Sequence, residues 1–155
     1  MTHPPLPSTV DSCRPTNTSH SSRFQALVKL LLLTQRSKGL APYLDDETID
    51  ALSMLAPLHD IGKTLLPPSI LDKPAQLSPE ELELVKTHTI EGCRILASIP
   101  AIVENPAFGY AYDFCRHHHE RVNGRGYPDR LCGAEIAPYV QVISLADAYD
   151  ALRSP

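Results

Sequence analysis

Residues that could bind metal ions recur along this sequence, each near the end or in the middle of a segment with a helical pattern. They are His59, Asp60, His88, His118, His119 and Asp147. The intervals between successive groups are near-regular, and each is long enough for one helix and its connection. Helical bundles commonly build metal sites from inward-facing side chains of neighbouring helices. The pattern therefore predicts that these side chains meet at one level of a bundle.

The predicted ligands combine imidazole nitrogens with carboxylate oxygens. Such a set suits Fe, Mn, Co, Ni or Zn better than Ca or Mg. Asp60 could bridge two metal ions, and two bridged ions can clamp a phosphoryl group for in-line attack. Lys63 follows one turn later and could place its ammonium on a phosphate oxygen. Taken singly, these residues would ordinarily be hydrogen-bonded core histidines and a solvated lysine, but their number and regular spacing favour a metal site.

Two of the predicted ligands should point inward on their helices. His88 shares a helix face with Leu84 and Val85. Asp147 shares a face with Ile143, and an inward aspartate on an apolar helix costs free energy unless it is paired or bound to a metal ion. Both placements favour ligand roles.

The segment HHHERVNGRGYP, residues 117–128, combines a histidine run with residues that end a helix. Its two glycines and its proline predict a loop after a helix that ends near His118. Arginines surround this loop at Arg116, Arg121, Arg125 and Arg130. The loop could therefore attract an anionic ligand, although the chain has a net charge of −4.

The composition is that of an ordinary globular domain, with 155 residues, 43% of them hydrophobic and 21% charged. A net charge of −4 argues against a nucleic acid polymer as partner. Neither a signal peptide nor an apolar run long enough to span a membrane is evident. The 4 cysteines form no C-x-x-C pair. We expect a cytoplasmic protein with reduced thiols and no membrane association.

Helical patterns cover most of the chain, and strand patterns are nearly absent. We expect helices over residues 21–37, 46–58, 78–97 and 108–118, and a last helix from residue 138 onward. Ser78 and Glu81 form a capping box around Pro79, and Asp45 or Asp46 can cap the second helix. Residues 1–19 are rich in proline, serine and threonine and are expected to form a flexible arm. The predicted fold is all-α, a bundle of about five helices.

Three segments resemble the HD-GYP domains of bacteria, a branch of the HD superfamily of metal-dependent phosphohydrolases. They are HDIGK (residues 59–63), HHERVNGRGYP (118–128) and ISLADAYDAL (143–152). Residues 65–92 follow the same family pattern, and the likeness extends over about residues 17–155. A His-Asp pair alone is a weak signal, whereas these motifs in this order are specific. On this basis residues 20–155 are expected to form the HD-GYP domain.

The resemblance implies an HD-domain helical bundle with a bi- or trinuclear metal centre, often of Fe or Mn, with Zn, Ni or Co as alternatives. It implies hydrolysis of cyclic di-GMP to pGpG or on to GMP by a metal-bridging hydroxide. By position, Asp60 and Lys63 match catalytic residues, and His59, Asp60, His88, His118, His119 and Asp147 match metal ligands. Lys63, Arg121, Gly124, Arg125, Gly126, Tyr127 and Pro128 are expected to bind substrate. His117 matches no ligand and should be structural.

The sequence departs from the family pattern at both ends. His20 matches the histidine of a third metal site, but Thr16 stands where that site has a glutamate, so two metal ions are expected and His20 is only a candidate extra ligand. The pattern continues beyond ADAYDAL in the family, so the last helix looks cut short, with Leu145, Tyr149 and Leu152 partly exposed. Two alternatives therefore stay open. One is a weakly active or inactive module that binds a protein partner through the GYP loop, and the other is an HD-superfamily phosphohydrolase of another nucleotide.

Overall fold

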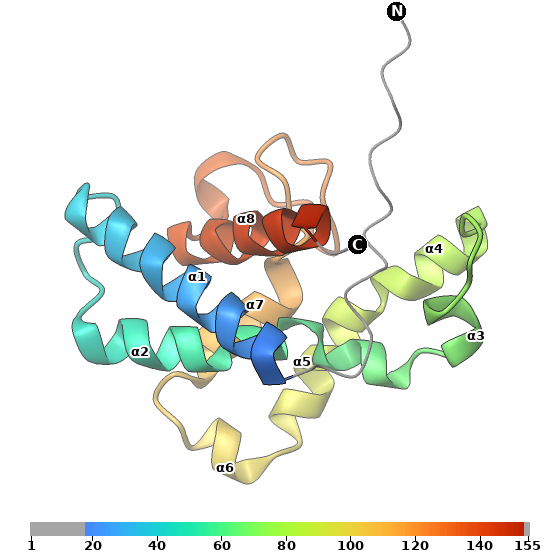
Figure 1. Cartoon of the computed structure of the whole chain (residues 1–155), viewed down its shortest axis with the longest axis horizontal. Coiled ribbons are helices and arrows are strands. Elements are labelled where there is room, and N and C mark those ends of the chain that lie inside the picture. The colour runs from blue at the N-terminus through green and yellow to red at the C-terminus, as the bar shows by residue number, and fades with distance from the viewer. Residues whose placement is uncertain (1–17, 154–155) are drawn as a thin grey trace, which may run out of the picture.

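The computed structural model describes residues 18–153, with side chains described from residue 21, and the regular secondary structure of this part of the chain is helical (Figure 1). Its helices are α1 (Thr18–Ser37), α2 (Asp46–Leu55), α3 (Pro68–Leu71), α4 (Pro79–Lys86), α5 (His88–Ala97), α6 (Pro100–Val103), α7 (Phe108–His117) and α8 (Pro138–Arg153), and its 3-10 helices are η2 (Ala56–Leu65) and η3 (Gly133–Glu135). Within the described residues, strand-like pairing is limited to one bridge between Asn123 and Cys132. The predicted all-α class is confirmed. The predicted arm lies almost wholly outside the described residues.

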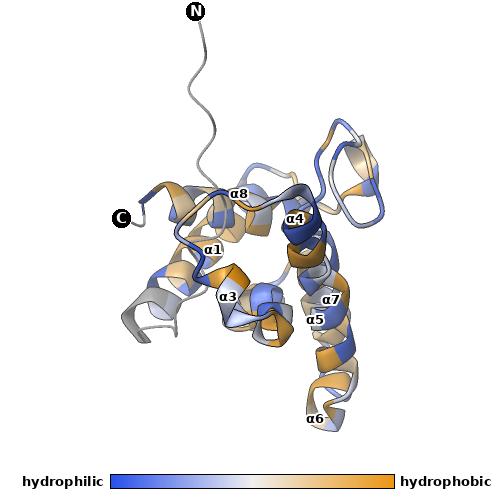
Figure 2. Ribbon diagram, turned by 90° about the vertical axis from the view of Figure 1, so that its right-hand side faces the viewer, coloured by the Kyte–Doolittle hydropathy of each residue, from blue (hydrophilic) through white to orange (hydrophobic). Residues whose placement is uncertain are grey.

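The main core lies where α1, α2, α7 and α8 meet. Fully or nearly fully buried side chains from these helices pack together there: Phe24, Val28, Leu32, Ile49, Leu52, Phe114, Val140 and Ile143. A smaller apolar cluster joins α5 to α7 and η2 through Cys93, Leu96, Ala111 and Cys115. Figure 2 shows α4, α5 and α6 following one another down one side of the molecule, with α7 beside α5 and α1 on the opposite side. The segment η2 lies between the two clusters and packs against both.

The second predicted helix ends earlier than expected. Asp45 caps α2 as predicted, because its carboxylate accepts a hydrogen bond from the Thr48 amide at 2.7 Å. The α-helix stops at Leu55 rather than Leu58, and a 3-10 helix that has proline in its first turn takes over. Pro57 has no amide hydrogen to donate to the preceding turn, so the α-helical pattern of hydrogen bonds cannot continue through it. His59 and Asp60 therefore lie on η2, not at the end of an α-helix.

The single helix predicted over residues 78–97 is wrong in one respect. The capping box at its start is present, with Ser78 and Glu81 bonded reciprocally, but the helix is interrupted at Thr87 between α4 and α5. The Thr87 hydroxyl donates to the Leu84 carbonyl at 2.7 Å, and His88 Nδ1 lies 2.6 Å from the Val85 carbonyl. These side chains compete for carbonyl groups that a continuous helix would use for its own amides.

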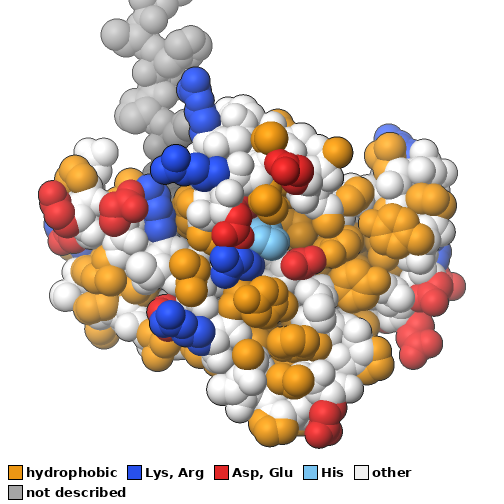
Figure 3. Space-filling view, turned by 180° about the vertical axis from the view of Figure 1, so that it is seen from behind, with side chains coloured by type: hydrophobic (Ala, Val, Ile, Leu, Met, Phe, Trp, Pro, Cys, Tyr) orange, Lys and Arg blue, Asp and Glu red, His pale blue; other side chains and the backbone are white. Residues whose placement is uncertain are grey.

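The outer face of α8 is exposed, as predicted. Leu145, Tyr149 and Leu152 are exposed, whereas Val140 and Ile143 on the other side of the helix are buried. In the view from behind (Figure 3), hydrophobic, basic and acidic side chains are interspersed and little histidine is visible, in keeping with the burial of His59, His88, His118 and His119. No helix in residues 18–153 combines the length and apolarity needed to cross a membrane.

Candidate metal centre

The structure brings the predicted ligand side chains together from four parts of the chain. Ligand atoms of Asp60, His88, His118 and His119 all lie within 4.8 Å of one another, and so do those of His59, Asp60 and Asp147. Asp60 belongs to both groups. His59 and Asp60 come from η2, His88 begins α5, His118 and His119 follow the end of α7, and Asp147 lies on α8. The side chain of the remaining candidate, His20, lies outside the described residues.

Three histidines turn the same ring nitrogen towards the centre. Nδ1 of His59, His88 and His118 lies 2.7, 2.6 and 2.7 Å from the carbonyl oxygens of Ala56, Val85 and Phe114, respectively. A carbonyl oxygen only accepts, so each Nδ1 carries a hydrogen, and Nε2 is the ring nitrogen left to bind a metal ion. Metal-binding histidines in proteins are typically oriented by such a bond from the other ring nitrogen.

These Nε2 atoms surround the Asp60 carboxylate. His88 Nε2 lies 3.4 Å and His118 Nε2 3.6 Å from Asp60 Oδ1. On the other side, His59 Nε2 lies 3.4 Å from Asp60 Oδ2. His59 Nε2 is also 3.7 Å from Asp147 Oδ1. The two groups of ligand atoms thus share Asp60, with one carboxylate oxygen towards each group.

This donor set fits divalent metal ions. The Nε2 atoms of His88 and His118 are 3.3 Å apart, and two lone pairs facing each other at that distance repel unless a cation satisfies both. His59 Nε2 is buried and has no hydrogen bond among the described residues. Imidazole nitrogens with carboxylate oxygens suit transition metals. The cluster therefore supports the use of divalent metal by this protein.

The histidines of the cluster differ in the direction in which their pKa values are shifted. Burial lowers the pKa of His88 to about 4 and holds the pKa of His119 well below its usual value. Burial alone would also lower the pKa of His59, but the carboxylates of Asp60 and Asp147 outweigh it and raise the pKa to about 10. Burial opposes ionisation of Asp60, yet His59 and its other neighbours hold its pKa well below normal. At neutral pH, His88 and His119 are neutral and ready to bind metal.

Lys63 is buried beside this cluster rather than solvated. Its side chain is almost inaccessible, and Nζ lies 2.7 Å from Asp60 Oδ2. The two residues are one turn apart on η2, so the same local geometry positions both. An ammonium group is thereby placed at the edge of the predicted metal site.

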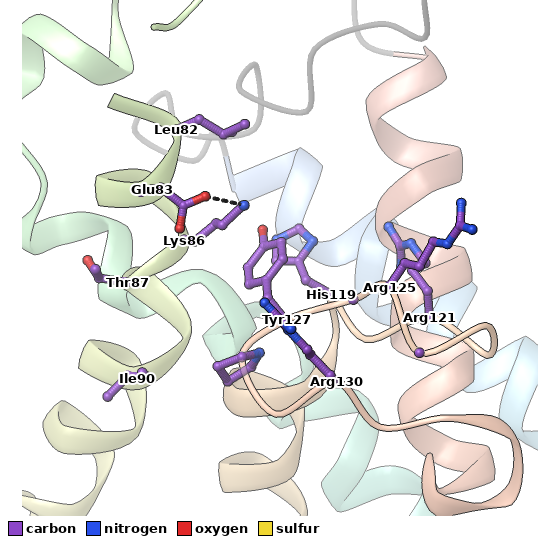
Figure 4. A pocket seen from close by; sticks show the side chains of 13 residues that line it. Leu82, Glu83, Lys86, Thr87, Ile90, His119, Arg121, Arg125, Tyr127 and Arg130 are labelled. Atoms are coloured by element: carbon purple, nitrogen blue, oxygen red, sulfur yellow. Dashed lines mark hydrogen bonds and ion pairs between the residues drawn. The ribbon is translucent and has the colours of Figure 1, made fainter. Parts of the chain in front are cut away.

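The loop after α7 forms one wall of a pocket of about 800 Å³ beside the cluster (Figure 4). The residues predicted to bind substrate there all line it: Arg121, Gly124, Arg125, Gly126, Tyr127 and Pro128. The facing wall comes from α4 and α5. The Tyr127 ring stacks on His119, with ring centroids 4.7 Å apart, and His119 also lines the pocket. The pocket therefore borders the ligand cluster at His119, whereas Lys63, also predicted to bind substrate, is not among the residues that line it.

Glu120 is a site residue that the sequence interpretation missed. It is 2% exposed, and its Oε1 accepts hydrogen bonds from the amides of Asp129 and Arg130 at 2.7 and 2.9 Å. Arg116 binds the Asp129 carboxylate through two hydrogen bonds, at 2.6 and 2.8 Å. Glu120 and Arg116 thus fix the far end of the loop that carries Tyr127. The sequence signal available was only an acidic residue directly after two predicted ligands.

His117 lies outside the ligand cluster, as the sequence predicted. Its Nε2 is 2.9 Å from Asp129 Oδ2, so the ring helps to anchor the same loop. From α8, the Ser144 hydroxyl donates to the His118 carbonyl at 2.6 Å. Ser144 was not predicted from the sequence either. It ties the helix that carries Asp147 to the segment that carries His118.

Two glycines allow backbones to meet at the site. A Cβ atom on Gly62 would lie 1.9 Å from the His88 carbonyl oxygen, and one on Gly126 would lie 2.4 Å from Glu120 Cα. No side chain fits at either position. Gly62 lets η2 contact the start of α5, and Gly126 lets the loop fold back against the residue after His119.

Comparisons with known proteins agree with this architecture. A family model described as HD domain matches residues 11–155. The chain is 36% identical over 111 residues to the cyclic di-GMP phosphodiesterase response regulator RpfG of Xanthomonas campestris, covering 72% of this chain and 28% of the relative. It is 40% identical over 106 residues to a cyclic di-GMP phosphodiesterase of Thermotoga maritima, covering 68% of this chain and 28% of the relative.

Another similar protein is named for a related but different activity. The chain is 34% identical over 109 residues to the 3'3'-cGAMP-specific phosphodiesterase 2 of Vibrio cholerae, covering 70% of this chain and 20% of the relative. The chain thus spans 20% to 28% of the length of these three relatives. The family match and the ligand cluster lead to one conclusion: this chain belongs to the HD domain family, which confirms the resemblance on which the sequence interpretation rests.

Proposed function

We propose that this chain is the catalytic core of a metal-dependent phosphodiesterase that hydrolyses cyclic di-GMP in the cytoplasm. The observation that carries the proposal is Asp60, which is common to two groups of ligand atoms. A shared carboxylate between two such groups suits a pair of metal ions. The cyclic di-GMP phosphodiesterases among the relatives support the choice of substrate.

In this proposal, His88, His118 and His119 hold one divalent ion with Asp60, and His59 and Asp147 hold the second with Asp60. Iron or manganese is the proposed metal, with zinc, nickel or cobalt as alternatives. When bound, two such ions supply an activated water nucleophile and neutralise charge on the phosphodiester. His20 is left as a candidate for an additional ligand.

The residues of the chain position the substrate for this reaction. Arg121 and Arg125 on the pocket wall supply positive charge for phosphate oxygens, and the loop from Gly124 to Pro128 holds the ligand next to His119. Lys63 places an ammonium group where charge develops on a phosphate oxygen in the transition state. Asp60 and Lys63 are therefore the proposed catalytic residues.

The balanced reaction consumes one water for each bond broken. The water oxygen forms a bond to phosphorus, the bond from phosphorus to the ribose 3' oxygen breaks, and that oxygen leaves as a hydroxyl after taking a proton. The first hydrolysis converts cyclic di-GMP to linear pGpG, and a second would give two molecules of GMP.

A second candidate substrate is 3'3'-cGAMP, because relatives named for that specificity are 32% to 34% identical to the chain.

Purification without oxygen, elemental analysis and turnover of a panel of cyclic dinucleotides test both candidates. The proposal predicts about two metal ions per chain and turnover of cyclic di-GMP. Binding of a protein partner at the GYP loop, with no metal and no turnover, would overturn it.

A further inference from the structure

We infer that Glu83 recognises the Watson–Crick edge of a guanine base, so that this site selects cyclic dinucleotides that contain guanine. The inference rests on the proposed function and specifies its substrate class. It begins with the wall of the pocket that faces the GYP loop, which the phosphodiesterase chemistry itself does not require.

Glu83 lies on α4, across the pocket from the loop (Figure 4). It is the one acidic side chain among the described residues that line this pocket, whereas Lys86, Arg121, Arg125 and Arg130 are basic. An exposed carboxylate repels the phosphates of an anionic ligand. A lone carboxylate in a basic pocket is instead suited to an uncharged, hydrogen-donating part of that ligand.

A chain of contacts connects Glu83 to the ligand cluster. Its Oε1 lies 2.5 Å from Lys86 Nζ, and that ammonium lies 5.5 Å from the centre of the Tyr127 ring. Tyr127 in turn stacks on His119. The Glu83 side chain is 71% exposed in this ion pair, so its carboxylate still has acceptor positions to offer to a ligand in the pocket. A dinucleotide whose phosphate lies near His119 could extend a base towards α4.

The chemistry of the bases makes this contact selective. The Watson–Crick edge of guanine presents two adjacent donors, N1–H and the N2 amino group, and a carboxylate can accept from both. The same edge of adenine presents an N1 acceptor beside its amino group, and the N1 lone pair repels a carboxylate. Enzymes that read single bases commonly combine such edge contacts with flat packing surfaces. Leu82 and Ile90 on the same wall, and Pro128 opposite, provide apolar surface.

The relatives agree with this selection. Some are named for cyclic di-GMP and others for 3'3'-cGAMP, and both molecules contain guanine. One guanine-reading position would accept either ligand, whereas cyclic di-AMP has no guanine to offer. The inference therefore predicts discrimination between cyclic di-GMP and cyclic di-AMP, rather than between the two guanine-containing ligands.

The test uses metal-loaded protein and two readouts. Competition between cyclic di-GMP and cyclic di-AMP in one reaction gives the ratio of their kcat/KM values. Calorimetric titration with GMP and with AMP gives a ratio of Kd values without turnover. Glu83→Gln replaces an acceptor by an amide that can both accept from N6 and donate to N1 of adenine. We expect each guanine preference to fall by about tenfold or more, the scale of one bidentate base contact.

Glu80→Gln is the matched control, because Glu80 is an exposed glutamate on the same helix that does not line the pocket. It should leave both ratios unchanged. If the wild type turns over cyclic di-GMP and Glu83→Gln keeps its preference, Glu83 is a surface ion pair only and the inference is overturned alone. If the wild type neither binds nor hydrolyses a cyclic dinucleotide, the proposed function and the inference about Glu83 both fail.

Discussion

The ammonium nitrogen of Lys63 lies 2.7 Å from Oδ2 of Asp60, the carboxylate that belongs to both groups of ligand atoms. A buried lysine in this position can act in two ways. It can stabilise charge on the substrate, or it can only orient Asp60. The two roles make different demands on metal content, so they can be separated.

Replacing Lys63 by methionine should keep the metal ions and lose catalysis. We expect about two metal ions per chain by elemental analysis and a fall in kcat of about 30-fold to 1000-fold, the usual effect of removing one aimed charge or donor. Lys29→Met is the control, because Lys29 pairs with Asp50 on the exposed surface. Loss of metal in the Lys63 variant would instead show that Lys63 orients the ligands.

Replacing Asp60 by asparagine should remove a ligand from both ions at once. We expect metal content to fall below one ion per chain and turnover to fall by about 100-fold or more. Replacing a residue that only supports a metal ligand already lowers metal affinity or activity by about 10-fold to 100-fold, and Asp60 is itself a ligand. His59→Ala should cost one ion only. His117→Ala is the control, since His117 is next to His118 but bonds to Asp129. Two ions per chain in the Asp60 variant would refute the bridging role.

Metal binding should release a proton from His59. Its pKa in the metal-free protein is raised to about 10, so it is protonated at pH 7.5 and must lose that proton to bind a metal ion. The His59 contribution to the stability of the metal-free fold is fully present below its unfolded pKa and is lost as the pH rises through 10. Metal affinity should therefore rise about tenfold per pH unit from pH 7.5 to about pH 10, where His59 loses its proton without metal. Calorimetry in buffers of different ionisation enthalpy measures the proton, and equal heats would contradict this assignment.

The ligand cluster could be predicted from the sequence because metal ligands require particular residue types. His59, His88, His118 and Asp147 also recur at intervals that suit helices and their connections. Helix starts were predictable where local chemistry sets them, as at the capping box of Ser78. In both cases the signal is the residue type at a given position, which the sequence states directly.

Features that depend on the exact path of the backbone were not predictable. The interruption at Thr87 arises when side chains take the carbonyls of the preceding turn, which the helical pattern of residues 78–97 does not reveal. Glu83 faces the loop of residues 124–128 across the pocket, and this position depends on how α4 packs relative to that loop. The carboxylate of Glu120 finds its partners nine and ten residues later, around a loop whose path only the fold determines.

The glycine of HDIGK should prove structural. Gly62→Ala would place a Cβ 1.9 Å from the His88 carbonyl oxygen, so η2 and α5 would have to separate. We expect a loss of about 3 kcal/mol or more in the free energy of unfolding, in line with severe overpacking, together with loss of metal. Gly109→Ala is the control, because a Cβ there meets nothing within 4 Å. It should stabilise α7 by up to about 1 kcal/mol. Equal melting temperatures for the two variants would show that the close approach does not matter.

Glu120 should control the loop without touching substrate. Glu120→Ala leaves the buried amides of Asp129 and Arg130 without their acceptor, and each such loss costs about 1–3 kcal/mol. A freed loop would also move Tyr127 away from His119, so KM should rise while the metal content stays near two. Glu120→Gln keeps an acceptor oxygen at the same place and should restore most of the stability and most of the affinity. If both variants lose metal instead, Glu120 supports the ligands His118 and His119 rather than the loop. Thermal melting, elemental analysis and steady-state kinetics on the same preparations distinguish the two results.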